Sequence, residues 1–207
     1  MRRIAIIGSS GSGKSTLGRQ LSDLLNVDLI HFDRLCWKPD WVPTSNAERQ
    51  QQLDRYLQKE RWIIEGDGDR ANPNLIYDRR FAHADTIVWL DFPRHTCFWQ
   101  IVQKYLNDSG DRQDLPAGCQ PNIFHKGFLN FLKQLWNYPQ RDRQIVGEKI
   151  QRYWPEKRVF ILRRPTEVKD FIHAIARVNF LSTSAVSPKV SKTKPTISKL
   201  ISIPATS

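Results

Sequence analysis

Cysteines and acidic residues are scarce in this chain of 207 residues, and long apolar runs are missing. The three cysteines, Cys36, Cys97 and Cys119, share no C-x-x-C spacing with one another or with a histidine, so neither a disulfide framework nor a zinc site is predicted. No apolar run approaches the roughly 20 residues of a membrane span. The apolar stretch at residues 4–7 has only a strand's length, which argues against a secretory signal. We therefore expect a cytoplasmic protein with no membrane partner.

Basic residues outnumber acidic ones by 32 to 21, giving a formal net charge of +11 and a pI near 9.8. This excess suits an anionic partner, either nucleic acid or a highly phosphorylated substrate. After Asn179, Ser, Thr and Pro dominate, no acid occurs, and four lysines contribute +4 of the charge. We expect one α/β domain over residues 1–179, followed by a disordered basic tail over residues 180–207 with too few aromatics to stack on bases.

A P-loop motif, G-x-x-x-x-G-K-[ST], occupies residues 8–15, behind an apolar β-branched run and before a stretch that can form a helix. Its glycines let backbone N–H groups curl around a phosphate, and the helix N-terminus adds partial positive charge. Lys14 is expected to reach the β- and γ-phosphates, and the Ser15 hydroxyl to ligate Mg²⁺. The predicted nucleotide-binding residues of this stretch are Gly8, Ser9, Gly11, Ser12, Gly13, Lys14, Ser15 and Thr16.

Three carboxylates follow predicted strands. Asp33 ends a strand over residues 27–32 and should emerge beside the P-loop, to touch an acceptor or a metal-bound water; an ordinary loop aspartate is the alternative. The strands over residues 61–66 and 86–91 each have the apolar-run-then-acid form of a Walker B strand, which holds Mg²⁺. By pattern alone Asp91 is the cleaner match, and Glu65 is its rival.

Other segments add candidate partners for substrates. Residues 34–43, with Trp37 and Trp41, form a predicted acceptor-side insertion; the tryptophans either stack on a flat acceptor or anchor a local core. The cluster of Arg70, Arg79 and Arg80 either binds an anionic acceptor or lies on a solvated helix face. A helix over residues 94–107 leads into residues 108–121, whose composition predicts a lid.

Two further helices are predicted over residues 123–136 and 140–153. The first has aromatic and leucine residues at helical spacing, which indicates core packing. A strand over residues 158–162 and a helix over residues 167–178 follow.

These stretches together resemble the adenylate-kinase-like P-loop proteins, and most closely the small bacterial group named DNA topology modulation proteins. The resemblance covers about residues 1–176 and rests on the P-loop, on residues 31–39 (HFDRLCWKP), 62–66 (WIIEG), 84–94 (ADTIVWLDFPR) and 117–119 (AGC). It implies a P-loop NTPase fold with a doubly wound five-stranded parallel sheet and helices on both faces. It also implies ATP binding and phosphoryl transfer to a small acceptor.

The resemblance also implies site residues. It favours Glu65 and Asp33 over Asp91 at Mg²⁺, although the group usually shows Asp where Glu65 stands. Kinases of this fold place two arginines where this chain has Gln100 and Lys104. An ammonium lacks the bidentate fork of a guanidinium, so Arg112, Arg141 or Arg143 would have to compensate.

The sequence thus predicts an ATP-binding, Mg²⁺-dependent phosphotransferase of the adenylate-kinase type that acts on a small acceptor. Lys14, Asp33 and Arg112 are its predicted catalytic residues, and Lys104, Arg141 and Arg143 complete the nucleotide-binding set. Two alternatives are a nucleotide-gated DNA-associated protein and a nucleotide-binding protein without catalysis.

Overall fold

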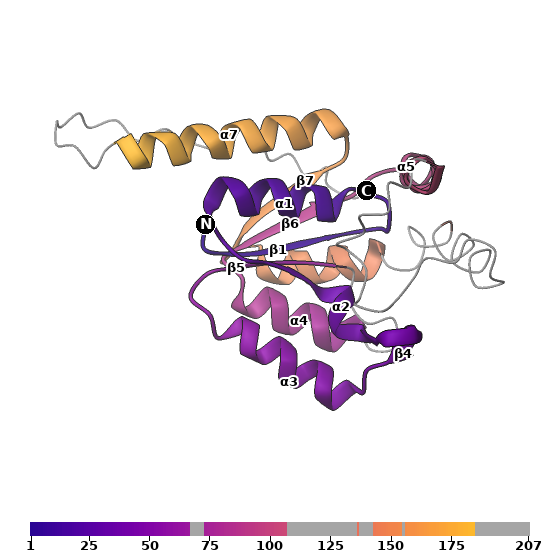
Figure 1. Ribbon diagram of the computed structural model, residues 1–207. Coiled ribbons are helices and arrows are strands. Elements are labelled where there is room, and N and C mark those ends of the chain that lie inside the picture. The colour runs from indigo at the N-terminus through magenta and orange to yellow at the C-terminus, as the bar shows by residue number, and fades with distance from the viewer. Residues whose placement is uncertain (67–72, 107–135, 137–142, 155, 185–207) are drawn as a thin grey trace.

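Five parallel strands form the central sheet in the computed structural model, which describes residues 1–66, 73–106, 136, 143–154 and 156–184 (Figure 1). Their order is β2-β5-β1-β6-β7. The strands are β1 (Arg3–Gly8), β2 (Leu29–His31), β5 (Trp62–Glu65), β6 (Thr86–Leu90) and β7 (Arg158–Leu162). Most are nearly continuous apolar runs, as expected for strands that are buried on both faces. Their carboxyl ends meet at one edge, where the P-loop leaves β1.

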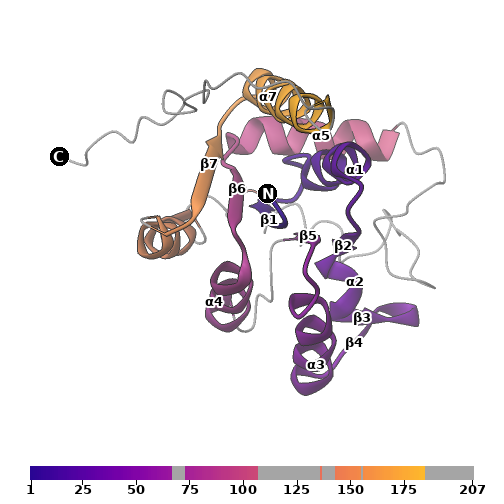
Figure 2. The ribbon, with the colours of Figure 1, turned by 90° about the vertical axis from the view of Figure 1, so that its left-hand side faces the viewer.

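Helices cover both faces of this sheet (Figure 2). On one face lie α1 (Lys14–Leu25), α5 (Arg94–Leu106) and α7 (Pro165–Ser184), and on the other lie α3 (Asn46–Leu57), α4 (Pro73–His83) and a helix over residues 143–153. Successive residues of β1 point to opposite faces, so Ile4 and Ile6 join one core cluster while Ala5 and Ile7 join the other. The predicted doubly wound five-stranded parallel sheet is confirmed.

The second strand is shorter than the predicted range of 27–32. β2 ends at His31, and the chain turns directly into the short helix α2 (Phe32–Cys36). This helix places Phe32 and Leu35, three residues apart, on one face that is buried in the core. Asp33 consequently lies in the first turn of a helix and not on a loop.

The predicted insertion folds into a small hairpin. Strands β3 (Trp37–Lys38) and β4 (Val42–Pro43) pair around η1, a 3-10 turn over Pro39–Trp41. The helix α3 follows, and the Ser45 hydroxyl caps it by accepting a hydrogen bond from the Glu48 N–H.

The last helix extends beyond its predicted end. α7 continues through the predicted domain boundary at Asn179 to Ser184, and the Asn179 side chain donates a hydrogen bond to the Leu24 carbonyl. The remainder of the predicted tail and the predicted lid lie outside the described residues, as does the predicted helix over residues 123–136 apart from Trp136. Within the described part of the chain, no helix has the length and apolarity to cross a membrane.

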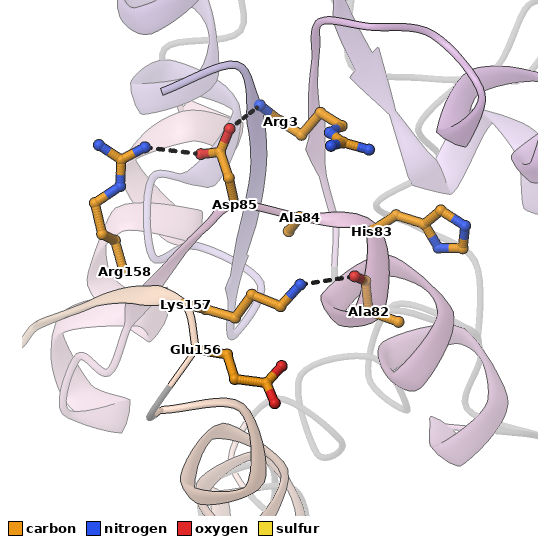
Figure 3. A pocket seen from close by; sticks show the side chains of 8 residues that line it. All are labelled: Arg3, Ala82, His83, Ala84, Asp85, Glu156, Lys157 and Arg158. Carbon is orange, nitrogen blue, oxygen red and sulfur yellow. Dashed lines mark hydrogen bonds and ion pairs between the residues drawn. The ribbon is translucent and has the colours of Figure 1, made fainter.

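A polar cavity of about 600 Å³ lies at the amino-terminal edge of the sheet, opposite the P-loop (Figure 3). Asp85 stands at its wall and accepts hydrogen bonds from the backbone N–H groups of Arg2 and Arg3 and from the Thr86 hydroxyl. Arg158 pairs with the same carboxylate. Asp85 thus ties the starts of β1, β6 and β7 together.

Asp85→Asn should lower stability near neutral pH, because the carboxylate loses its charge and part of its acceptor capacity. Burial raises the pKa of Asp85, but the hydrogen bonds outweigh it and leave the pKa below its ordinary value. The stabilisation is therefore fully present above the unfolded pKa, near 3.9, and is lost as pH falls through the lowered folded pKa. With 30% of the side chain exposed, screening reduces the expected loss to about 1 kcal/mol.

Thermal melts should thus show a Tm about 2–4 °C lower at pH 7, with the difference shrinking below about pH 4. Asp28→Asn is the matched control, since Asp28 also pairs with a basic side chain but is 73% exposed. An equal Tm loss in the control, or a loss at Asp85 that does not depend on pH, would contradict this account.

Candidate active site

The P-loop bends sharply between β1 and α1, and its glycines make the bend possible. Gly11 and Gly13 have φ values of 79° and 89°, in the left-handed region that L side chains rarely adopt. A Cβ atom on Gly11 would lie 2.3 Å from the Cys97 carbonyl oxygen of α5. Gly11 therefore also permits the close packing of α5 against the loop. The backbone around the loop has the shape of an anion cradle.

Lys14 begins α1 and is largely buried, with 8% of its surface exposed. Its ammonium donates hydrogen bonds to the carbonyls of Gly8 and Ser9, at 2.7 and 3.0 Å. An ammonium has three donors, so one is left after these two contacts. The lysine is held inside the loop with a donor to spare for a phosphate oxygen.

Glu65 lies at the end of β5, next to the first turn of α1. Its Oε1 atom accepts hydrogen bonds from the Ser15 hydroxyl, at 3.1 Å, and from His31 Nδ1, at 2.6 Å. His31 and Glu65 are partners in the register of β2 and β5, so their side chains project from the same face of the sheet. A Cβ atom on Gly18 would be packed 3.6 Å from Glu65 Cγ and only 2.8 Å from Leu29, so this glycine brings α1 close to both strands.

Burial alone would raise the pKa of Glu65, because desolvation disfavours the charged carboxylate. The hydrogen bond from His31 and the positive charge of Lys14 outweigh that effect, and the pKa lies below its ordinary value. Glu65 is therefore ionised at neutral pH, and its charge faces the P-loop.

Asp91, the rival carboxylate, already forms ion pairs with two arginine side chains. Arg143 binds it at 2.8 Å and Arg163 lies at 3.6 Å. Burial raises the pKa of Asp91 despite these two arginines. Of the two acids, Glu65 is the one that the structure brings to Ser15. Arg143 belongs to the predicted nucleotide-binding set, and its guanidinium faces Asp91.

Asp33 is exposed at the start of α2 and lies close to Gly66, the residue after Glu65. Its Oδ1 would be 3.4 Å from a Cβ atom on Gly66, whose φ is 135°. The Gly66 carbonyl accepts a hydrogen bond from Arg80, which is fully buried and packs its guanidinium over the rings of Phe32 and Tyr77. Arg80 therefore fits neither sequence interpretation, because it supports the turn after β5 from inside the core.

Of the other predicted arginines, only some lie among the described residues. Arg79 pairs with Asp54 on α3, while Arg70, Arg112 and Arg141 lie outside the described residues. The side chain of Lys104 is likewise not described. Gln100 faces the P-loop from α5, with its Oε1 atom 4.0 Å from a Cβ position on Gly13. It also lines a cavity of about 570 Å³ along α5.

The residues around the P-loop fit a nucleotide phosphate with its magnesium ion. Among the described residues, no group of three or more His, Cys, Asp and Glu side chains could enclose a metal by itself. One hydroxyl and one ionised carboxylate suit Mg²⁺, which keeps several waters and takes its other ligands from phosphates. Ser12 adds a buried hydroxyl inside the loop that has no hydrogen-bond partner among the described residues.

The chain is similar to known P-loop kinases in sequence and in fold. No protein-family model matches the chain. Shikimate kinase of Sulfurihydrogenibium sp. (strain YO3AOP1) is 27% identical over 131 residues, covering 58% of this chain and 74% of the relative. Shikimate kinase of Persephonella marina (strain DSM 14350 / EX-H1) is 26% identical over 110 residues, covering 47% and 66%.

Among solved structures, shikimate kinase from Acinetobacter baumannii in complex with shikimate superposes with a TM-score of 0.50 at 13% identity, over 88% of this chain and 94% of that chain. This likeness confirms the α/β P-loop fold, and the two sequence relatives confirm the expected enzyme class, a P-loop kinase. The closer resemblance to the topology modulation group stays a prediction.

Sequence reasoning missed His31, Gly18 and the burial of Arg80. His31 was detectable in principle, because it ends the strand that lies beside the strand ending in Glu65. The missing information was the register that sets the two residues side by side.

Proposed function

We propose that this protein transfers the γ-phosphoryl group of ATP to a hydroxyl of a small ring-bearing acceptor, with Mg²⁺ as cofactor. The observation that carries the proposal is the meeting of Lys14, Ser15 and ionised Glu65 at the P-loop. The two shikimate kinases at 26% and 27% identity support a small-molecule acceptor and make shikimate the first compound to test.

Catalysis in such a site is mainly positioning and charge neutralisation. The P-loop amides would bind the phosphates, and Lys14 would add a cation through its remaining donor. Ser15 and Glu65 would hold Mg²⁺, which when bound neutralises phosphate charge. Asp33, exposed at the same edge of the sheet, is suited to orient the acceptor hydroxyl and to accept its proton.

The hairpin of β3 and β4 lies at this carboxyl edge, beyond α2 (Figure 1). Trp37 and Trp41 are 38% and 41% exposed, and their rings meet edge to face with centroids 5.7 Å apart. Asp40 and Trp41 both have a left-handed backbone, with φ of 60° and 59°. Aspartate adopts this region comparatively readily, but a bulky residue such as Trp41 stays there only where the surrounding structure enforces it, and such strain clusters at functional sites. Both tryptophans keep part of their surface exposed at this edge, and we assign them to the acceptor.

Trp37→Ala and Trp41→Ala should each raise the KM for the acceptor about 3–10-fold, because a ring-stacking contact contributes about 0.5–1.5 kcal/mol. The KM for ATP should stay unchanged. Steady-state kinetics with each substrate varied in turn would measure both values. Trp99→Ala on α5 is the matched control, since that tryptophan is also exposed but lies on another element. A rise in the KM for ATP instead would contradict an acceptor role.

The direct test of the proposed function is ATP turnover in the presence of Mg²⁺ with shikimate and with other cyclic and open-chain hydroxyl compounds. Phosphorylated acceptor formed by the parent and not by Lys14→Ala would support it. Salt-dependent DNA binding, with and without nucleotide, should be measured on the same samples. Nucleotide-gated DNA binding without turnover of any acceptor would favour the alternative and overturn the proposal.

A further inference from the structure

His31 is a buried titratable side chain next to the P-loop that the proposed chemistry does not use. Only 8% of its surface is exposed, and its Nδ1 atom lies 2.6 Å from Glu65 Oε1. The pairing of β2 with β5 fixes the two backbones in register. The contact therefore joins two rigid strands and does not depend on a loop.

Both donors to Glu65 bind the same carboxylate oxygen. Ser15 approaches Oε1 from α1 and His31 approaches it from β2. Among the described residues, no hydrogen bond is made to Oε2. An ionised carboxylate that is held at one oxygen by two donors has its plane fixed, and its second oxygen remains available to a further ligand.

The need for such an anchor follows from the length of the side chain. Glutamate has one more rotatable bond than aspartate, so a glutamate that serves a metal must be restrained to keep its carboxylate in one orientation. Mg²⁺ accepts little deviation from octahedral geometry. Donors that orient a metal-binding carboxylate typically contribute 10–100-fold to metal affinity.

We infer that His31 is a positioning residue that holds Glu65 in the orientation required for Mg²⁺ at the P-loop. The inference rests on the proposed function, because it assumes that Glu65 serves the metal. His31 itself touches neither nucleotide nor metal in this arrangement. Its effect should appear in the dependence of nucleotide binding on Mg²⁺ and not in nucleotide binding without metal.

The test is binding of a fluorescent ATP analogue by the full chain at increasing Mg²⁺ concentration. His31→Leu removes the donor, and the Mg²⁺ concentration for half-maximal effect should rise about 10–100-fold while affinity in excess chelator stays unchanged. His31→Asn restores a donor near the Nδ1 position. Its Mg²⁺ concentration for half-maximal effect should therefore lie close to the parental value. His83→Asn is the control, since His83 Nδ1 contacts a backbone carbonyl at an exposed site.

His31→Gln keeps the experiment decisive if His31→Leu fails to fold, because its amide nitrogen reaches the place of Nε2 and not that of Nδ1. The His31→Asn variant should then reach half-maximal effect at a lower Mg²⁺ concentration than the His31→Gln variant. Equal Mg²⁺ dependence in the parent and all variants would overturn the inference, as would an equal loss of affinity with and without metal. A parent protein that binds no nucleotide at all would overturn the proposed function together with it.

Discussion

Lys14→Ala is expected to lower ATP turnover about 10²–10³-fold. The Lys14 ammonium is buried and preorganised, with two hydrogen bonds to the carbonyls of Gly8 and Ser9. Loss of one preorganised donor that faces developing charge costs about 2.7–4 kcal/mol in the transition state. A lysine that was already fixed before the nucleotide arrives needs no reorganisation during the reaction, which makes the larger end of this range the expectation.

The measurement is kcat/KM for ATP at saturating acceptor, with thermal melts to confirm that the variant folds. Lys157→Ala is a matched control, because the Lys157 ammonium also donates to a backbone carbonyl, that of Ala82, at the opposite edge of the sheet. The control should retain parental turnover. Parental nucleotide affinity and turnover in Lys14→Ala would show that the P-loop does not serve ATP in this protein.

The fold could be predicted because its signals are local. Each strand is a short apolar run, and most of these runs are followed by a glycine or an acid. The P-loop specifies its own context of strand, turn and helix. The predicted second strand is too long, because residues 27–32 form one apolar-rich run in the sequence. Tertiary packing of Phe32 and Leu35 determined where the strand ends and α2 begins.

From the residues alone, the site could be predicted only where it lies within one continuous segment, the P-loop. The choice between Glu65 and Asp91 depends on which cations reach each acid, and Arg143 lies 52 residues from Asp91 in the chain. His31 and Glu65 are 34 residues apart, and only strand register brings them together. The sequence leaves Arg80 either as a ligand for an anionic acceptor or as a cation on a solvated helix face. Charge alone does not reveal that its guanidinium donates a hydrogen bond to the Gly66 carbonyl and packs over two aromatic rings.

Gln100→Arg is expected to speed phosphoryl transfer, because it supplies the charge that the sequence lacks at the P-loop. The Gln100 side chain ends close to Gly13, the residue before Lys14, and it faces a cavity with room for a longer side chain. Lys104 lies one helical turn further along α5, so Lys104→Arg would add a fork on the same face. Guanidinium binds phosphate oxygens bidentately, whereas an amide or an ammonium does not.

An arginine that stabilises transferring phosphate contributes about 10³-fold or more to kcat, so even partial restoration by the double variant should exceed about tenfold in a single-turnover assay. Gln103→Arg is the control, because it adds the same charge to the same helix and cavity without lying within 4 Å of a Cβ position on Gly13. It should leave the rate unchanged. If the double variant is no faster than the parent while Arg112→Ala abolishes turnover, an arginine of the predicted lid already neutralises the phosphates, and α5 has no part in the charge balance.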